Sequence, residues 1–266
     1  MIRVHDSITH LDEQDAGNVV VAASHGGRYC GYCAASGGVL GAIFSDAGVG
    51  LENAGIAALD YLEELGVPAA TVDYRSARIG DGADLARRGR ISFCNAQALA
   101  LGCAPGQATM LCAQHMERAP RSQLTPPVYE EARTLLLERP GSEKVWGLDS
   151  NSLVTPDDAG AIVVTGSHGA LLGGRPETAL RIDALAAVYN DAGVGIDDAG
   201  ISRLPALDAR GIAAVTVDAW SARIGDARST WASGKISHAN SLAQAYGCRA
   251  GMSVPAFVES VFRSIT

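Results

Sequence analysis

The sequence has few aromatic residues, few lysines and no long apolar run. Aromatic residues make up 5% of the 266 positions, and the lysines are Lys144 and Lys235. The net charge of −8 excludes the positive excess with which proteins hold nucleic acids or anionic membranes. No apolar run reaches the roughly 18 residues of a membrane-spanning helix, and the first residues lack a signal-peptide pattern. We therefore expect a cytoplasmic protein that binds neither nucleic acid nor membrane.

Cysteine is present at six positions, but without the spacing of a disulfide framework. We interpret all six as reduced thiols. Cys30 and Cys33 form a Cys-x-x-Cys pair, which a redox or metal site could use, but no second pair completes a zinc site. The favoured interpretation is two cysteines in the core of a helix. Low aromatic content and abundant alanine and glycine indicate close helix packing and a homo-oligomer.

Short polar signatures occur twice in the chain, which indicates an internal duplication. The second copy follows the first by 143 to 145 residues. The pairs are Ser76–Asp81 with Ser221–Asp226, Ser24–Gly26 with Ser167–Gly169, Asp46–Gly50 with Asp191–Gly195, and Asn95 with Asn240. Because polar residues that are alike in two copies indicate a shared role, we expect the functional site among them.

The duplication predicts a chain of two homologous units. We assign repeat one to residues 1–117, a connecting segment to 118–144 with a short helix around 128–138, and repeat two to 145–266. Short β-branched apolar runs alternate with helical patterns in each repeat. The fold class is therefore α/β, with two βαβ-type repeats of parallel strands, a pseudo-twofold relation and three α/β/α layers.

The duplicated signatures follow expected strands directly. In repeat one the strands cover about 18–23, 39–44 and 67–72, and in repeat two about 161–165, 185–189 and 212–217. Ligand sites of parallel α/β sheets lie beyond the carboxyl ends of the strands. The sequence therefore predicts that the site forms where these strand ends meet.

Histidine, serine and aspartate at the strand ends are the candidate catalytic residues. Imidazole titrates near neutral pH, so His25 or His168 would be the general base. Ser76 or Ser221 would be the nucleophile or a hydrogen-bond donor, and Asp46 or Asp191 would orient the histidine. Each group also has a purely structural interpretation: the histidine can bond the backbone, and the aspartate can cap a helix.

Substrate binding is expected from arginines and from small or polar residues near the same strand ends. Arg78 or Arg223 could hold a carboxylate, although an internal ion pair with Asp81 or Asp226 is an equal alternative. Backbone amides near Gly48 and Gly193 could stabilise an oxyanion. The further candidates are Ser24, Ser167, Asn95, Asn240 and His238.

A metal site is a weaker possibility. His25, His168, Asp46 and Asp191 would supply four ligands of suitable type, but no local metal-binding motif supports them. We therefore predict no cofactor, with a metal ion as the alternative.

The order of His25-Gly26 and then Asp46-Ala47 resembles, in outline, the strand-end arrangement of caspase-like peptidases. Ala47 or Gly48 stands where that family carries its nucleophilic cysteine, and Ala192 or Gly193 does so in the second copy. The resemblance therefore implies an α/β topology and no peptidase activity.

These observations predict an enzyme that acts on a small polar or carboxylate-bearing metabolite. The favoured reaction is hydrolysis of an amide, imide or ester by strand-end serine, histidine and aspartate with an arginine clamp. The alternatives are an isomerase or lyase with its site between the repeats, and a non-catalytic protein that binds a small ligand.

Overall fold

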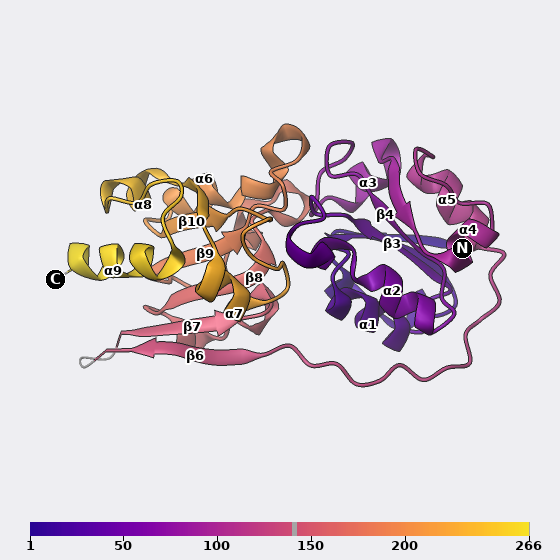
Figure 1. The fold of residues 1–266 in the computed structure, drawn as a ribbon, viewed down its shortest axis with the longest axis horizontal. Helices are drawn as coiled ribbons and strands as arrows, with labels where there is room; N and C mark the ends of the chain where they lie inside the picture. The colour runs from indigo at the N-terminus through magenta and orange to yellow at the C-terminus, as the bar shows by residue number, and fades with distance from the viewer. Residues whose placement is uncertain (140–142, 266) are drawn as a thin grey trace.

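The computed structural model describes residues 1–139 and 143–265, and residues 140–142 and 266 lie outside the described part. Two similar halves lie side by side, each with a mixed, mostly parallel sheet between helices (Figure 1). A long segment without regular structure, 117–132, joins them along the outside of the molecule. The predicted α/β class with three layers and two similar halves is confirmed.

The first half contains a five-stranded sheet in the order β1-β2-β3-β4-β5. Its first four strands are parallel and β5 is antiparallel to β4. The strands are β1 (Ile2–His5), β2 (Val19–His25), β3 (Gly41–Ser45), β4 (Ala69–Val72) and β5 (Ile91–Cys94). The helices are α1 (Arg28–Ser36), α2 (Ala58–Glu64), α3 (Gly82–Arg88), α4 (Ala96–Ala100) and α5 (Thr109–Met116).

Strand β2 shows why three layers form. Val19, Val20 and Val21 are fully buried, as expected for a strand covered on both faces. Val20 packs in the core cluster beneath α1 and α2, whereas Val19 and Val21 pack in the cluster beneath α3, α4 and α5. Successive side chains point to opposite faces of a strand, so one apolar run fills both cores.

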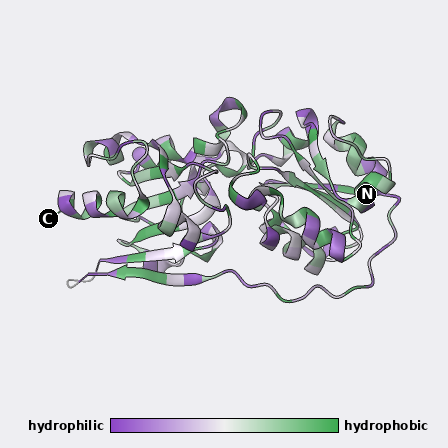
Figure 2. Cartoon of the chain, in the orientation of Figure 1, coloured by the Kyte–Doolittle hydropathy of each residue, from purple (hydrophilic) through white to green (hydrophobic). Residues whose placement is uncertain are grey.

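The second half repeats this plan with six strands in the order β11-β10-β9-β8-β7-β6. The strands are β6 (Arg133–Glu138), β7 (Lys144–Leu148), β8 (Ile162–His168), β9 (Ala186–Asn190), β10 (Ala213–Val217) and β11 (Ile236–Ala239). The helices are α6 (Arg203–Asp208), α7 (Ala227–Ser233), α8 (Ser241–Ala245) and α9 (Val254–Ile265). Apolar residues of α9 cover the sheet, whereas its charged residues Glu259 and Arg263 lie outside that core (Figure 2). Within the described residues, no helix has both the length and the apolar character to cross a membrane.

Short 3₁₀ turns follow the strands at corresponding places in the two halves. They are η1 (Ile8–His10), η2 (Glu13–Asp15) and η3 (Leu51–Ile56) in the first half, and η4 (Asn151–Leu153), η5 (Pro156–Asp158) and η8 (Ile196–Ile201) in the second. The second half has η6 (Leu172–Gly174) and η7 (Pro176–Thr178) where the first has α1. Gly173 and Gly174 have positive φ angles there, which interrupts a helix.

The short helix expected around 128–138 is wrong. Residues 133–138 form β6 and pair antiparallel with β7, while 128–132 have no regular structure. Without β6, the edge of β7 would expose unpaired backbone groups. Leu136 and Leu137 also pack against the core of the second half, so tertiary pairing outweighs the helical tendency of the leucines.

The two halves meet through their duplicated loops. After Asp46, four consecutive residues have positive φ angles, from 50° at Ala47 to 72° at Gly48, and Ala192–Gly195 repeat this conformation. The backbones approach so closely that a Cβ placed on Gly48 would lie 2.9 Å from the Cα of Gly193. A loop in this conformation is strained, and the conformation persists only where contacts with the rest of the structure hold it.

Equivalent backbone hydrogen bonds fix the halves to each other. The N–H of Leu51 donates to the carbonyl of Ala219 at 2.9 Å, and the N–H of Ile196 donates to that of Tyr74 at 3.0 Å. A small apolar cluster from both halves surrounds these bonds; its buried members are Ala47, Ile79, Ala170, Ala192, Ala199 and Ile224. Contacts that come in equivalent pairs are what a pseudo-twofold interface requires.

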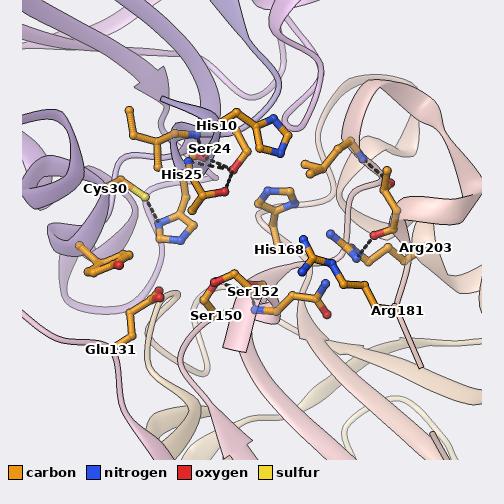
Figure 3. Close-up of a pocket in the computed structure, with 18 of the residues that line it drawn as sticks. His10, Ser24, His25, Cys30, Glu131, Ser150, Ser152, His168, Arg181 and Arg203 are labelled. Atoms are coloured by element: carbon orange, nitrogen blue, oxygen red, sulfur yellow. Dashed lines mark hydrogen bonds between the residues drawn. The ribbon is translucent and has the colours of Figure 1, made fainter. Parts of the chain in front are cut away.

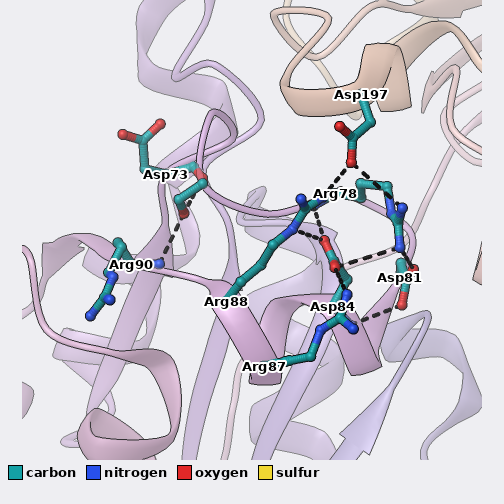
Figure 4. A network of polar contacts seen from close by, with 9 residues as sticks. Asp73, Arg78, Asp81, Asp84, Arg87, Arg88, Arg90 and Asp197 are labelled. Carbon is teal, nitrogen blue, oxygen red and sulfur yellow. Dashed lines mark hydrogen bonds and ion pairs between the residues drawn. The ribbon is translucent and has the colours of Figure 1, made fainter.

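Ion pairs close the rim of this interface (Figure 4). Asp197 of the second half accepts from Arg88 at 2.6 Å and lies 3.5 Å from Arg78. On the opposite side, Glu52 lies 3.0 Å from Arg223. These pairs are partly exposed, so each stabilises the interface by only about 0–1 kcal/mol.

We expect Gly48→Ala to destabilise the interface between the two halves. Gly66→Ala is the matched control, because Gly66 has a similar φ of 69° with nothing within 4 Å of its added Cβ. The control should lose about 1 kcal/mol of the free energy of unfolding, because only backbone strain is added there. Gly48→Ala should lower the free energy of unfolding by a further 1–3 kcal/mol or so, because its methyl group meets the other backbone. Chemical denaturation measures both; equal losses would contradict this view of the interface.

Candidate functional site

A polar cavity of about 230 Å³ lies between the two halves. Several of its lining residues are equivalent pairs, above all His25 with His168 and Ser24 with Ser167 (Figure 3). Strands β2 and β8 end at these residues, so the carboxyl ends of two separate sheets meet at one cavity. The structure thus brings together four of the residues named from the sequence.

His25 and His168 make the same backbone contact. Nδ1 of His25 accepts the N–H of Gly27 at 3.1 Å, and Nδ1 of His168 accepts that of Ala170 at 3.2 Å. A neutral ring whose Nδ1 accepts carries its proton on Nε2. Among the described residues, nothing accepts a hydrogen bond from either Nε2. Both rings therefore offer an N–H donor to a ligand, and the general-base role expected from the sequence stays a prediction.

Burial keeps both rings neutral. It lowers the pKa of His25 from 6.5 to about 4, because the imidazolium would lose its hydration. Burial also lowers the pKa of His168, and the nearby charge of Arg203 adds to the effect. At neutral pH the cavity thus holds two uncharged hydrogen-bond donors.

Hydroxyl groups line the cavity in two equivalent sets. Ser24 accepts the N–H of Ile8 at 2.9 Å, and Ser167 accepts that of Asn151 at the same distance. The hydroxyls of Ser150 and Ser152 lie 2.8 Å apart, as Ser7 and Thr9 do at 2.9 Å. No described histidine is hydrogen-bonded to any of these hydroxyls, so the arrangement favours ligand binding over activation of a serine nucleophile.

Arg203 is the most unusual group of the cavity. Its side chain is 3% exposed, yet none of the described residues gives it a carboxylate partner. Nε donates to the carbonyl of Ala170 at 2.9 Å, and Nη1 donates to those of Thr178 and Ala179. The guanidinium also lies 5.0 Å from the ring centre of Tyr189. A buried charge without a counter-ion is costly, and a bound anion would offset that cost.

Two more arginines extend the positive side of the cavity. Arg181 lies beside Arg203 (Figure 3) and forms no ion pair with any described residue. Arg175 lies 3.8 Å from Asp6, which leaves its charge incompletely paired. All three arginines come from the second half, as does the exposed Glu177, so this side of the cavity has a net positive charge although its scaffold is symmetrical.

Glu131 lies on the other side of the cavity and was missed by the sequence analysis. It belongs to the connecting segment and lines the cavity near His25 (Figure 3). Burial raises its carboxyl pKa from 4.5 to about 7, and the charge of Asp149 adds to the shift. A carboxyl with a pKa near neutral pH is suited to acid–base chemistry. No sequence signal could find it, because the segment has no counterpart in the other repeat.

Ser76 and Ser221 lie outside the cavity. The Ser76 hydroxyl donates to the carbonyl of Asp73 at 2.7 Å and accepts the N–H of Arg90 at 2.9 Å. Ser221 makes the equivalent bonds to Asp218 and Lys235 at the same distances. Both hydroxyls therefore hold a turn, and among the described residues neither bonds a histidine.

Asp46 and Asp191 organise the interface loops. One oxygen of Asp46 accepts from Gly48 and Tyr74, and one of Asp191 accepts from Gly193 and Ala219. Burial raises the pKa of Asp46 from 3.8 to about 6 and that of Asp191 in the same direction. Neither carboxylate bonds a histidine of the described chain, and the amides of Gly48 and Gly193 are already occupied.

Arg78 and Arg223 form the internal ion pairs that the sequence offered as the alternative to binding a substrate carboxylate. Arg78 bonds Asp81 at 2.9 Å, and Arg223 bonds Asp226 at 2.9 Å. Arg78 also lies 3.5 Å from Asp84 of its own half and 3.5 Å from Asp197 across the interface (Figure 4). Arg223 reaches across the interface to Glu52. The structure therefore uses both arginines to join the halves.

The last three candidates lie away from the cavity. Asn95 caps α4 by accepting from Ala98, and Asn240 caps α8 by accepting from Ala243, both at 3.0 Å. His238 is on the exposed face of β11. A strong capping role explains why asparagine occurs in both repeats.

A metal centre receives no support from side-chain placement. Across residues 1–139 and 143–265, no group of three or more histidine, cysteine, aspartate or glutamate side chains is placed to hold a metal ion. The four ligands considered from the sequence, His25, His168, Asp46 and Asp191, thus do not form such a group.

Comparison with known proteins gives no relative. No protein-family model matches the sequence, and neither a curated protein nor a solved structure matches it. The function must therefore be inferred from the chemistry of the cavity.

The neutral histidines make stability depend on pH. Between about pH 4 and 6.5 an unfolded His25 binds a proton that the folded ring does not, so stability falls as the pH falls. The slope due to this ring is at most about 1.4 kcal/mol per pH unit, and less because the ring is partly exposed. We expect His25→Gln to lose less stability than the native protein between pH 7 and 4.5 in urea denaturation. Identical pH profiles would contradict a neutral His25.

Proposed function

We propose that the protein is an enzyme acting on a small carboxylate-bearing metabolite in the cavity between its halves. The observation that carries this proposal is Arg203, a buried cation without an acidic partner in a cavity that also holds two neutral imidazole donors. A carboxylate at Arg203 would offset the buried charge, and Arg181 would add a second positive group. The cavity volume of about 230 Å³ suits a small metabolite.

Hydrolysis of an amide, imide or ester is the favoured reaction. With the carboxylate held by Arg203, a carbonyl further along the substrate can accept hydrogen bonds from Nε2–H of His25 and His168. These donors would stabilise the oxyanion that forms when water adds to the carbonyl carbon. Glu131 would take a proton from that water and return it to the leaving nitrogen or oxygen.

Direct attack by water replaces the serine nucleophile expected from the sequence. The hydroxyls of Ser76 and Ser221 are committed to their own turns. Among the described residues, the cavity serines are hydrogen-bonded to no histidine or carboxylate, whereas Glu131 has a pKa of about 7. A base that is half-ionised near neutral pH can activate water without a covalent intermediate.

Proton transfer at carbon is the second candidate. His25 and His168 are equivalent donors from the two halves, and an enolate is an oxyanion that they could stabilise equally well. In this isomerase or lyase reaction Glu131 would remove a proton next to the carbonyl group. Product oxygen from labelled water would support hydrolysis, whereas deuterium from solvent at substrate carbon without oxygen labelling would support proton transfer.

Carboxylate binding can be tested by thermal shift with small dicarboxylates, their amides and cyclic imides. A ligand at one hundred times its dissociation constant stabilises the protein by about 2.7 kcal/mol. Arg203→Gln should abolish this shift. Arg210→Gln is the matched control, because Arg210 likewise donates to backbone carbonyls, those of Leu180 and Ile182, but does not line the cavity. An equal effect of both variants, or no stabilising carboxylate, would reject the proposal.

Glu131→Gln should lower kcat by about 10²–10⁴-fold with any substrate found in that screen, because it removes the acid–base group and keeps the shape. In the native protein, kcat should rise with pH around a midpoint near 7, as the carboxyl loses its proton. Glu130→Gln, at the exposed neighbouring position, is the control and should leave kcat unchanged. A native pH profile in the Glu131→Gln variant would exclude Glu131 as the base.

A further inference from the structure

A second cavity of about 200 Å³ adjoins the first. The two share His25, Tyr29 and Glu131 in their linings. His168 and Arg203 line only the first cavity. Two of the three residues proposed to act at the carbonyl group, His25 and Glu131, therefore lie at the boundary between two spaces, whereas His168 and the anion site at Arg203 belong to the first alone.

The second cavity exists on one side of the pseudo-twofold axis because the halves differ there. At Gly80 an added Cβ would lie 2.5 Å from the carbonyl of Leu171, and the N–H of Gly173 donates to the Gly80 carbonyl at 2.7 Å. The loop that carries η6 thus fills this side. At the equivalent Gly225 the nearest atom to an added Cβ is Cε1 of His25, at 3.4 Å. Next to His168 the η6 loop fills this space. Next to His25, where α1 replaces that loop, the equivalent space is open.

The walls of the second cavity differ chemically from those of the first. Tyr29 and Tyr129 form one wall, with ring centres 6.2 Å apart. Arg223 is already bonded to Glu52 and Asp226. The lining holds three carboxyl groups and two guanidinium groups in total: those of Glu52, Asp226 and Glu131, and those of Arg28 and Arg223. This composition suits an uncharged or amine-derived group with a ring, and disfavours a second carboxylate.

We propose that the substrate is the monoamide of a dicarboxylic acid: its free carboxylate binds at Arg203, its amide lies between His25 and Glu131, and its amine part occupies the second cavity. The inference rests on the proposed hydrolysis. Water adds to the amide carbon and gives one proton to Glu131. The C–N bond then breaks, and the nitrogen takes that proton and leaves as a free amine. The products are a dicarboxylic acid and an amine, so no oxidant or co-reactant is needed.

Two ketones that cannot be hydrolysed test the second cavity by calorimetry. Levulinate carries a carboxylate, a carbonyl and a methyl group, and fits the first cavity alone. Its analogue with a phenethyl group in place of the methyl group should reach the second cavity and bind about tenfold tighter or more, as about 1.4 kcal/mol of added contact would give. Arg203→Gln should weaken both ligands, because both depend on the anion site.

Variants of the second cavity should affect the longer ketone alone. Ala57→Phe fills the cavity, and Tyr129→Ala removes one wall from an exposed segment without touching either core. Both should reduce the tenfold preference while leaving levulinate affinity unchanged. Ala57→Ser and Val128→Ala, the latter at a neighbouring position that is 78% exposed, are the matched controls.

The outcomes separate the two proposals. If levulinate binds but the phenethyl ketone gains nothing, or if its gain survives in both Ala57→Phe and Tyr129→Ala, the second cavity does not hold the amine part and this inference is wrong. The proposed carboxylate site would then still stand. If neither ketone binds, the carboxylate site fails and this inference fails with it.

Discussion

The contact of two left-handed loops on the pseudo-twofold axis is the constraint on which the rest of the structure depends. Gly48 and Gly193 allow the backbones to touch, and Asp46 and Asp191 hold the loops by accepting their amides. Residues with positive φ on both sides make this arrangement costly, at about 1–3 kcal/mol for each strained position. The strain does not act on a substrate. The contact between the loops fixes the distance between the two sheets, and this distance sets the width of the cavity between β2 and β8.

A symmetrical scaffold then carries an asymmetrical site. The paired histidines and serines would treat both ends of a ligand alike, but the three arginines lie on one side and Glu131 on the other. The arginines come from the loop between β8 and β9 and from α6 in the second half, whereas Glu131 comes from the connecting segment. Because neither group has a counterpart in the other repeat, a bound anion would take a single orientation. Such polarity is what a reaction at one defined bond requires.

The sequence predicted the fold better than the site. The reason is that repeated polar residues indicate equivalent places in the two halves, whether these line the cavity or hold the structure together. Buried β-branched runs such as Val19–Val21 indicate a strand whichever residues surround it, so the α/β class was accessible. Repetition also pointed to His25 and His168, which share a cavity. The same signal equally selected Asp46 and Arg78, because an interface between similar halves needs equivalent residues on both sides. It also selected Ser76, because each half contains the turn that this serine holds. Arg203 and Glu131 carry no repeat signal, since their importance comes from burial that only the folded chain creates.

The position of Glu131 links the connecting segment to the chemistry. The segment is held to the first half by hydrogen bonds from Tyr61 to the carbonyl of Pro127 and from Ser122 to that of Leu65. It continues into β6, which is paired to the second sheet. Glu131 therefore lies between two anchored points, one on each half, and its burial depends on both halves being in place. Its raised pKa is thus a property of the assembled molecule, so acid–base function would arise only when the interface that forms the cavity is intact.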